Sequence, residues 1–600
     1  MSSTHFTQPL LKINGSPVST AFARDLIEVV VDSSLHLPSL FTVVLDDPEL
    51  TWVDDSLLSI GAQVEISITT GKDQGGLSGT LIKGEITALE PHFAAQGTEH
   101  LSTLAIRGYD KSHRLHRGKR TRTFLKQKDS GIVQTIAGEA GLSAEVDQTT
   151  VTYDYVLQNN QTNMEFLISR AERIGYQVSV SEGKLCFRRG DYSRGDGPDL
   201  RLGEQLRDFR PCWSATHQAD KVLVQGWDTT TKKAITTTVT PTASLNQGGM
   251  LKTGADIAKD AFQSAEAVVT DHPVLTVDEA KELATGLNND IGREFVEAEG
   301  TCDGDPRILA GWKVNIVGVG QRFSGKYWVT SATHTYNEEG YTTSFSITGR
   351  HPNTLSYLLD SGNGHDPARG MMRGVVTALV TNLDDPDDLG RVKVKYAWLG
   401  EIESHWVRVA APMAGAQRGF YYLPEINDEV LVAFEHGDPH YPVIIGSLWN
   451  GTDKPPKPNS AVVQGGVVNE RIIQSRSGHV VILDDTNGSE KIIIRDKTEK
   501  NEIIISSSDN SMAINVEGDF TVTAKGKITL TSTLDMALES KANSKINAGA
   551  NLNVEATGSS TVKGVQLTLE GTGKSELKAP MVSVNGNAMV EVKGALVKIN

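Results

Sequence analysis

The last ninety residues of the chain alternate apolar and polar positions and repeat a pattern every seven or eight residues. The stretch INVEGDFTVTAKGKITLTS (514–532) shows the alternation that is typical of strands with one buried face. Small residues recur at one phase of the repeat, and seven of them are glycines: Gly518, Gly526, Gly558, Gly564, Gly571, Gly586 and Gly594. The pattern predicts strands of about five residues joined by corners, where glycine permits a positive φ or a close backbone approach.

A strand this short cannot bury its apolar face alone, and two geometries solve the problem. A single chain can coil as a solenoid with three repeats per turn. Alternatively, three chains can intertwine, each supplying one strand to each level of a three-sided prism. The period does not separate the two geometries. In the prism each repeat advances by one strand spacing, so roughly eleven repeats give a stiff rod on the order of 50 Å long.

Residues 1–365 show mostly short strand patterns, with helical patterns inserted. Helices are expected within 129–143, 162–177 and 276–295. Thr162 three residues before Glu165 predicts a capping box, and Thr276 with Glu279 repeats the device. The segment SGNGHDPARG (361–370) has no apolar periodicity, so we expect it to be a linker.

Residues 371–450 contain five short strand patterns within about 80 residues. This density predicts a small closed barrel, because closure removes the unpaired edges that would otherwise aggregate. A proline-rich connector (451–470) follows, and the remaining residues (471–600) are predicted to be β-structure that ends in the repeat. The predicted fold class is therefore mainly β.

Composition excludes several function classes. The 600 residues carry a formal net charge of −16, which disfavours general binding to nucleic acid or to an anionic membrane. Three cysteines without a CxxC pair provide neither a disulfide framework nor a thiolate zinc site. The N-terminus lacks a basic segment followed by an apolar one, and no run of 18 apolar residues occurs. We therefore expect assembly in the cytoplasm without a signal peptide.

The barrel segment carries a specific set of motifs. They include DDPDDLGRVKV (384–394), HWVRV (405–409) and DEVLVAFEHGDP (428–439). The key positions are Gly390, Arg391, Trp406, Pro424, Asp428, Gly437, Asp438 and Pro439. In order and spacing they resemble the OB-fold domain of VgrG-type spike proteins, the central spikes of contractile injection systems, which are related to the hub and needle of contractile phage tails. Residues 106–124 and 158–180 resemble hub segments of the same family more loosely.

The resemblance implies a homotrimer with a defined domain order. A phage tail hub-like region of two β-barrel subdomains with inserted helices (1–365) precedes the OB-fold (371–450). A linker (451–470) leads to an intertwined, triple-stranded β-helical needle (471–600). No lysozyme domain fits between barrel and needle. The implied role is to connect a hexameric inner tube to the baseplate and to puncture the target cell envelope mechanically. The compact length favours an extracellular, phage-tail-like particle over a type VI secretion apparatus.

The resemblance also implies partners at the tip. Some phage needles end in a His-x-His element that binds iron, whereas this chain ends EVKGALVKIN. Spikes that lack the element are capped by a PAAR-type tip protein, whose docking face would be Leu596, Val597, Ile599 and Asn600. Effector cargo would be carried as separate chains.

Four polar segments could suggest chemistry, and each has a plainer interpretation. DDPDDLG (384–390) lacks calcium-loop spacing and favours a solvated turn. His436 and His440 stand four apart, but in a turn rather than on a helix. The basic run HRLHRGKRTR (113–122) favours docking to an acidic neighbour, or a solvated face, over nucleic acid. Cys302 is expected in a surface loop.

The sequence contains no G-x-S-x-G, H-E-x-x-H or P-loop pattern. We therefore expect no catalytic residue, no cofactor and no metal ion. Two alternatives remain open. One is a peptidoglycan-hydrolysing tail enzyme with the β-rod as its stalk, in which a discontinuous Ser-His-Asp triad escapes detection. The other is a trimeric adhesive fibre.

Overall fold

The computed structural model describes residues 6–35, 37–71, 76–95, 102–190, 193–241, 252–349, 370–372 and 374–599. The chain divides into two compact units, the first containing residues up to Gln474 with Ile482–Asn487, the second Ser475–Val481 with the residues from Gly488 onward. Among the described residues, no helix is long and apolar enough to cross a membrane. The mainly β prediction is confirmed. The predicted linker 361–370 lies outside the described residues except for Gly370.

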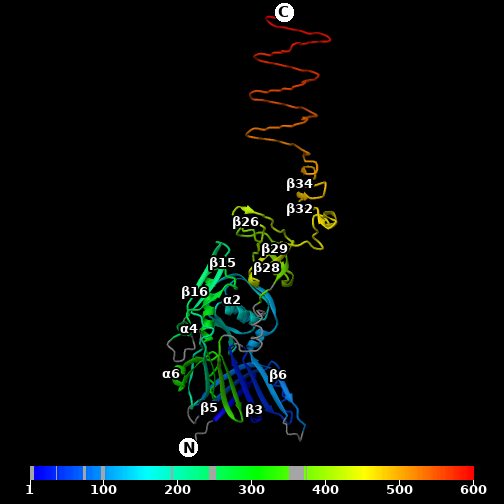
Figure 1. The fold of residues 1–600 in the computed structure, drawn as a ribbon. Coiled ribbons are helices and arrows are strands. Elements are labelled where there is room, and N and C mark those ends of the chain that lie inside the picture. The colour runs from blue at the N-terminus through cyan, green and yellow to red at the C-terminus, as the bar shows by residue number, and fades with distance from the viewer. Residues whose placement is uncertain are drawn as a thin grey trace. The chain divides into compact units, whose positions relative to one another are not determined.

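An eleven-stranded sheet dominates the first unit, and it joins segments that lie far apart in the sequence. Its strands run in the order β14-β18-β22-β21-β3-β4-β7-β6-β5-β1-β2. In Figure 1 the blue N-terminal strands lie beside green strands from near residue 340. Their bounds are β1 Phe6–Ile13, β2 Ser16–Pro17, β3 Leu26–Ser34, β4 Leu40–Asp46, β5 Gln63–Gly71, β6 Leu77–His92, β7 Thr103–Asp110, β14 Leu206–Trp213, β18 Val296–Asp303, β21 Ser331–Asn337 and β22 Gly340–Ile347.

The two halves of this sheet meet where β21 pairs antiparallel with β3, Ser331 opposite Ser34 and Tyr336 opposite Val29. Alternate residues of β3 and β4 are buried, as the apolar alternation predicts. The turn Glu338-Glu339 joins β21 to β22 in an antiparallel hairpin, with Asn337 opposite Gly340.

Four smaller sheets and the helices complete the region up to residue 349. The strands are β8 Arg120–Gln127 with β10 Tyr153–Gln161; β9 Ser143–Val146, β11 Tyr176–Ser181 and β12 Lys184–Arg189; β13 Asp196–Arg201, β19 Lys313–Val317 and β20 Gly325–Trp328; and β15 Lys221–Asp228, β16 Lys233–Val239 and β17 Glu266–Val269. The helices are α1 Thr20–Arg24, η1 Lys111–His116, α2 Asp129–Glu139, α3 Asn163–Arg173, α4 Gly254–Phe262, α5 Val277–Arg293 and α6 Gly320–Phe323.

The three predicted helices are confirmed as α2, α3 and α5. At α3, the Thr162 hydroxyl accepts from the N–H of Glu165, and the Glu165 carboxylate accepts from the N–H of Thr162, so the capping box is complete. At α5, Thr276 accepts from the N–H of Glu279, but Glu279 accepts from Leu275 instead. Helix α4 was not predicted, although Thr253 and Asp256 form the same reciprocal box at its start.

The barrel predicted for 371–450 is present as a five-stranded sheet in the order β24-β23-β28-β29-β25. Backbone hydrogen bonds between Val392 and Val407, of 3.0 and 2.7 Å, join its two outer strands and close it. The strands are β23 Val375–Asn382, β24 Lys393–Tyr396, β25 Arg408–Val409, β28 Glu429–Phe434 and β29 Pro442–Ser447, with a two-stranded arm of β26 Ala414–Gly415 and β27 Arg418–Gly419. Its core also includes Leu157 from β10.

The connector 451–470 holds short elements, and strands continue to residue 515. In order along the chain, the connector and the residues after it form α8 Asn459–Val462, β30 Val463–Gln464, β31 Val467–Val468, β32 Glu470–Gln474, β33 Val480–Asp484, β34 Lys491–Arg495, β35 Glu502–Ser506 and β36 Ser511–Asn515. The barrel that precedes the connector also contains two short helices, η3 Ala397–Leu399 and η4 Glu435–Gly437. In the second unit β34, β35 and β36 pair antiparallel in sequence order. Beyond them Figure 1 draws the orange-to-red chain as a zigzag of extended segments.

A buried histidine network ties β21 to β22. His334 is 1% exposed, and its Nε2–H donates to the carbonyl of Ile308 at 2.9 Å. Its Nδ1 therefore accepts, from the hydroxyls of Tyr341 at 2.7 Å and Thr343 at 3.1 Å. Burial lowers the pKa of His334 to about 4, because the neutral ring is satisfied and a charged ring would be desolvated.

Acid is therefore expected to destabilise the large sheet. The folded pKa of His334 lies below its unfolded value, so the stability is fully present above pH about 6.5 and is lost as pH falls toward 4, by up to about 3 kcal/mol. The substitution His334→Gln, whose amide can donate and accept but does not titrate, should flatten this part of the pH profile. Urea denaturation followed by tryptophan fluorescence between pH 7.5 and 4 measures it. The exposed His217→Gln is the control; equal pH profiles for all three proteins would contradict the expectation.

Candidate functional site

The turn that leads into β24 is organised around Asp385. Its side chain is almost fully buried and accepts from the backbone N–H groups of Asp387, Leu389 and Arg391 at 3.0–3.2 Å. The Arg391 guanidinium also binds Asp385 and Asp387, each at 2.5 Å. These contacts, chiefly that with Arg391, hold the pKa of Asp385 well below its usual range. A carboxylate neutralised in this way supports a turn over a calcium loop, although Asp385 itself is buried and not solvated as expected.

The turn between β28 and β29 holds a second buried carboxylate. Asp438 accepts from the Nδ1–H of His440 at 2.6 Å and from Arg173 of α3 at 3.2 Å. Burial opposes ionisation, but the hydrogen bonds from His440 and the charge of Arg173 outweigh it and keep the pKa of Asp438 well below normal. The Nε2 of His440 accepts from the N–H of Leu157 at 2.9 Å. Both ring nitrogens of His440 are thus engaged, which supports a structural turn over a metal pair with the exposed His436.

The remaining motif positions shape the barrel backbone. Gly390 and Gly437 have φ of +70° and +83°, where a side chain is strained. A Cβ at Gly437 would also lie 3.0 Å from the carbonyl oxygen of Met372. The Asp428 carboxylate accepts from the N–H of Glu425 at 2.7 Å, and Lys393 Nζ lies 5.3 Å from the ring centroid of Trp406. The last two motif residues, Pro424 and Pro439, are buried.

The acidic neighbours expected for the basic run 113–122 belong to the same chain. Arg114 binds Glu85 of β6 at 2.5 Å, and His113 contacts the same carboxylate at 3.1 Å. Arg122 and Arg120 bind Glu139 of α2 at 2.6 and 3.0 Å. Much of this positive charge therefore fixes η1 and β8 within the fold.

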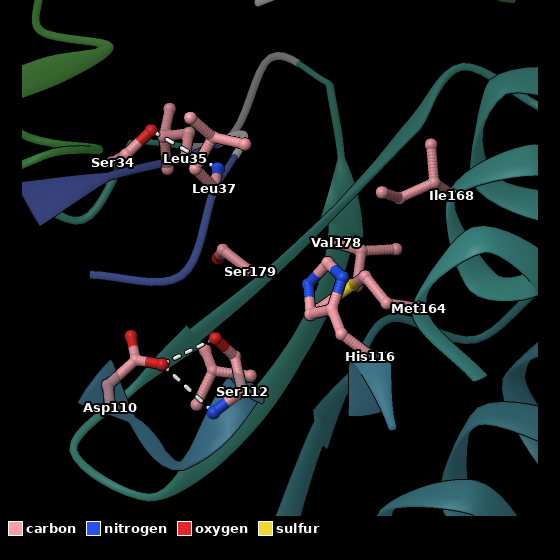
Figure 2. Close-up of a pocket in the computed structure, with 11 residues that line it drawn as sticks. Ser34, Leu35, Leu37, Asp110, Ser112, His116, Met164, Ile168, Val178 and Ser179 are labelled. Atoms are coloured by element: carbon pink, nitrogen blue, oxygen red, sulfur yellow. Dashed lines mark hydrogen bonds between the residues drawn. The ribbon is translucent and has the colours of Figure 1, made fainter. Parts of the chain in front are cut away.

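A small pocket brings together a serine, a histidine and an aspartate. Figure 2 shows Asp110 and Ser112 on one side of it, and His116 with Met164 and Ile168 of α3 on the other. The Ser112 hydroxyl and N–H both donate to Asp110. In a hydrolytic triad serine donates to histidine instead. With a volume of about 20 Å³, the pocket holds about one water and no substrate.

Cys302 is not in a surface loop, so that expectation was wrong. It lies in β18 at 0% exposure, and its thiol donates to the carbonyl of Thr343 at 3.4 Å. Burial raises the pKa of the thiol to about 12. Such a cysteine is an unreactive core residue.

Comparison with known proteins shows which families this architecture resembles. Residues 376–449 match a family model described as the type VI secretion system/phage-baseplate injector OB domain, and residues 6–338, more than half of the chain, match the Alg8 N-terminal domain. The chain is 29% identical over 198 residues to the type VI secretion system spike protein VgrG1b of Pseudomonas aeruginosa. It is 32% identical over 123 residues to the spike protein VgrG3 of Vibrio cholerae. The chain belongs to the Alg8 N-terminal domain family, and it is a VgrG-type spike protein.

The similarity to individual relatives is partial. The spike protein matches VgrG1b over 30% of its own length and 26% of that protein, and VgrG3 over 20% and 12%. A solved structure of a Francisella PdpA-VgrG complex in its lidded form aligns with 85% of this chain and 80% of that chain, with a TM-score of 0.50 at 10% identity. This likeness supports the fold alone.

The C-terminal segment of the spike protein is extended and bends at regular intervals. Between 516 and 599 the backbone bends eleven times, with seven or eight residues from one bend to the next. Gly518, Gly526 and Gly558 lie within bends, and the later repeat glycines lie just before them: Gly564, Gly571, Gly586 and Gly594. None of them has the positive φ that the sequence suggested, although a Cβ at Gly586 would lie 2.5 Å from the carbonyl oxygen of Met589.

The proposed tip residues stand at the end of this segment. Leu596, Val597 and Ile599 are exposed in the single chain, and Asn600 lies outside the described residues. Residues 516–599 form no β-strand that is hydrogen-bonded to another strand. Apolar side chains along this whole stretch are therefore exposed.

Removing Asp385 should destabilise the barrel specifically. Asp385→Ala leaves Arg391 half-buried without its main partner and frees three backbone N–H groups, a loss of roughly 2–4 kcal/mol. Asp384→Ala, an exposed carboxylate in the same turn, is the matched control. Thermal denaturation with and without millimolar calcium measures both. A calcium-dependent rise in Tm in the unsubstituted protein that Asp385→Ala abolishes would restore the calcium interpretation.

Proposed function

We propose that this protein is the trimeric central spike of a contractile injection apparatus, joining inner tube to baseplate and puncturing the target envelope mechanically. The observation that carries the proposal is the segment 516–599, which is regular in conformation yet unpaired within its own chain. Leu534, Leu538 and Val554 are among its most exposed apolar side chains, at 79–89%. Exposure on this scale calls for a covering partner.

Two further copies of the same chain would pair the backbone of this segment and cover its apolar side chains better than any other partner. A monomeric solenoid would pair each repeat with the one about 24 residues away, and no such pairing is present in the described residues. In the intertwined prism each unpaired strand meets a strand of another chain at every level, and the apolar face lies inside. Failure of the rod then requires three chains to shear together, which suits a puncturing tip.

The role is mechanical, with the other activities supplied by separate chains. The Ser112 hydroxyl bound to Asp110 and the water-sized pocket argue against a hydrolase. A Vibrio cholerae relative named an actin cross-linking toxin, VgrG1, is matched over only 10% of its length. We propose that the N-terminal region meets a hexameric tube and the baseplate, and that Leu596, Val597 and Ile599 receive a PAAR-type tip protein.

Light scattering on the purified full-length protein tests the trimer, and a matched pair of variants tests its cause. We expect a mass of three chains, against 64.8 kDa for one. Val554→Asp puts a charge on the apolar face and should shift the mass toward one chain or shorten the protease-resistant rod. Asn553→Asp adds the same charge on the opposite face and should leave both unchanged. A one-chain mass for the unsubstituted protein overturns the proposal, as does equal behaviour of the two variants.

The corner glycines give a second test, at the distal end. Gly586→Val places a side chain against the Met589 carbonyl and should disrupt the rod beyond residue 586 while residues 6–349 stay folded. Gly558→Val, where a Cβ meets nothing within 4 Å in the chain, should be milder. Limited proteolysis with mass mapping shows which segment is lost; equal loss of rod and N-terminal region would argue against independent parts.

A further inference from the structure

The OB barrel is joined to the N-terminal region by a small buried polar cluster. Arg173 of α3 donates to Asp438 at 3.2 Å, to the Tyr441 hydroxyl at 3.1 Å and to the carbonyl of Pro273 at 2.8 Å. His440 joins Asp438 to Leu157 of β10, whose side chain completes the barrel core. The 435–441 turn thus contacts α3 and β10, and this polar cluster is made by four side chains, those of Arg173, Asp438, His440 and Tyr441.

The geometry fixes the protonation state of His440. Asp438 is ionised and can only accept, so the hydrogen lies on Nδ1. The backbone N–H of Leu157 can only donate, so Nε2 carries the lone pair that accepts it. The ring is neutral, with one nitrogen facing each part of the chain. A second proton on Nε2 would point at the Leu157 N–H, and the bond could not form.

We propose that His440 is an acid-sensitive latch: it holds the OB barrel on β10 at neutral pH and releases Leu157 when the ring is protonated. Asp438 accepts the hydrogen bond from Nδ1 through one carboxylate oxygen in either state of the ring, and it accepts from Arg173 through the other oxygen. Protonation of Nε2 therefore removes the hydrogen bond to the Leu157 N–H and weakens the polar part of the junction, while the Leu157 side chain still packs in the barrel core. The other titratable groups around the latch are Tyr153 and Tyr155 of β10, Asp154, Glu279 of α5, His405 and Tyr441.

Hydrogen–deuterium exchange of the full-length protein, resolved to single amides, tests the latch directly. After correction for the intrinsic pH dependence of exchange, protection of the Leu157 amide should fall about tenfold between pH 7.5 and 5.0. Amides of β22 beside His334 report any general loosening of the large sheet, and the Leu157 loss should exceed theirs. The titration needs no substitution, so a variant that fails to fold does not decide the result.

Two histidine variants in the same turn assign the effect. His440→Gln does not titrate and should abolish the extra pH dependence at Leu157. The exposed His436→Asn should keep it. The proposal is overturned if Leu157 protection in the unsubstituted protein does not change beyond that of β22, or if the pH dependence persists in His440→Gln.

Discussion

The structure of this protein depends on one constraint: each strand must pair its backbone N–H and C=O groups and cover its apolar side chains. In the first unit every long strand has a neighbour, even where the neighbour comes from 300 residues away, as β21 does for β3. Residues 516–599 form no paired strands within the chain, although the alternation of apolar and polar residues continues. An extended strand without a partner is not stable in water. The trimer that we propose follows from that deficit.

Two turns that are rich in polar residues each contain a buried carboxylate paired with an arginine, and this pair fixes the conformation of the turn. In both turns, an aspartate accepts several N–H donors while one arginine neutralises it. A buried pair of this kind contributes little net stability, but loss of one partner is costly because the other charge is left uncompensated. The first pair, Asp385 with Arg391, fixes a turn within the barrel. The second, Asp438 with Arg173, fixes the position of the barrel on the preceding region.

The sequence predicts what is local and misses what is distant. The Thr162–Glu165 box located α3, and strand alternation located the five barrel strands. Thr253 and Asp256 have the same spacing, with aspartate in place of the usual glutamate, and this pair would have predicted α4. Cys302 was misplaced because burial of β18 depends on β22 and β14, to which it pairs across the sheet. The Leu157–His440 contact spans 283 residues and leaves no local signal at either end.

The repeat shows how a sequence period and a structural period can differ. The glycines slip by six residues between Gly558 and Gly564, yet the bends on either side are eight apart, because the glycine moves from inside a bend to just before it. With no positive φ at these positions, left-handed backbone cannot be what the glycines provide. Close contact is the better explanation where the chain itself approaches, as at Gly586 and Gly571. At Gly518, Gly526 and Gly558 nothing in the same chain lies within 4 Å, so contacts within the chain do not explain the glycines at these three positions.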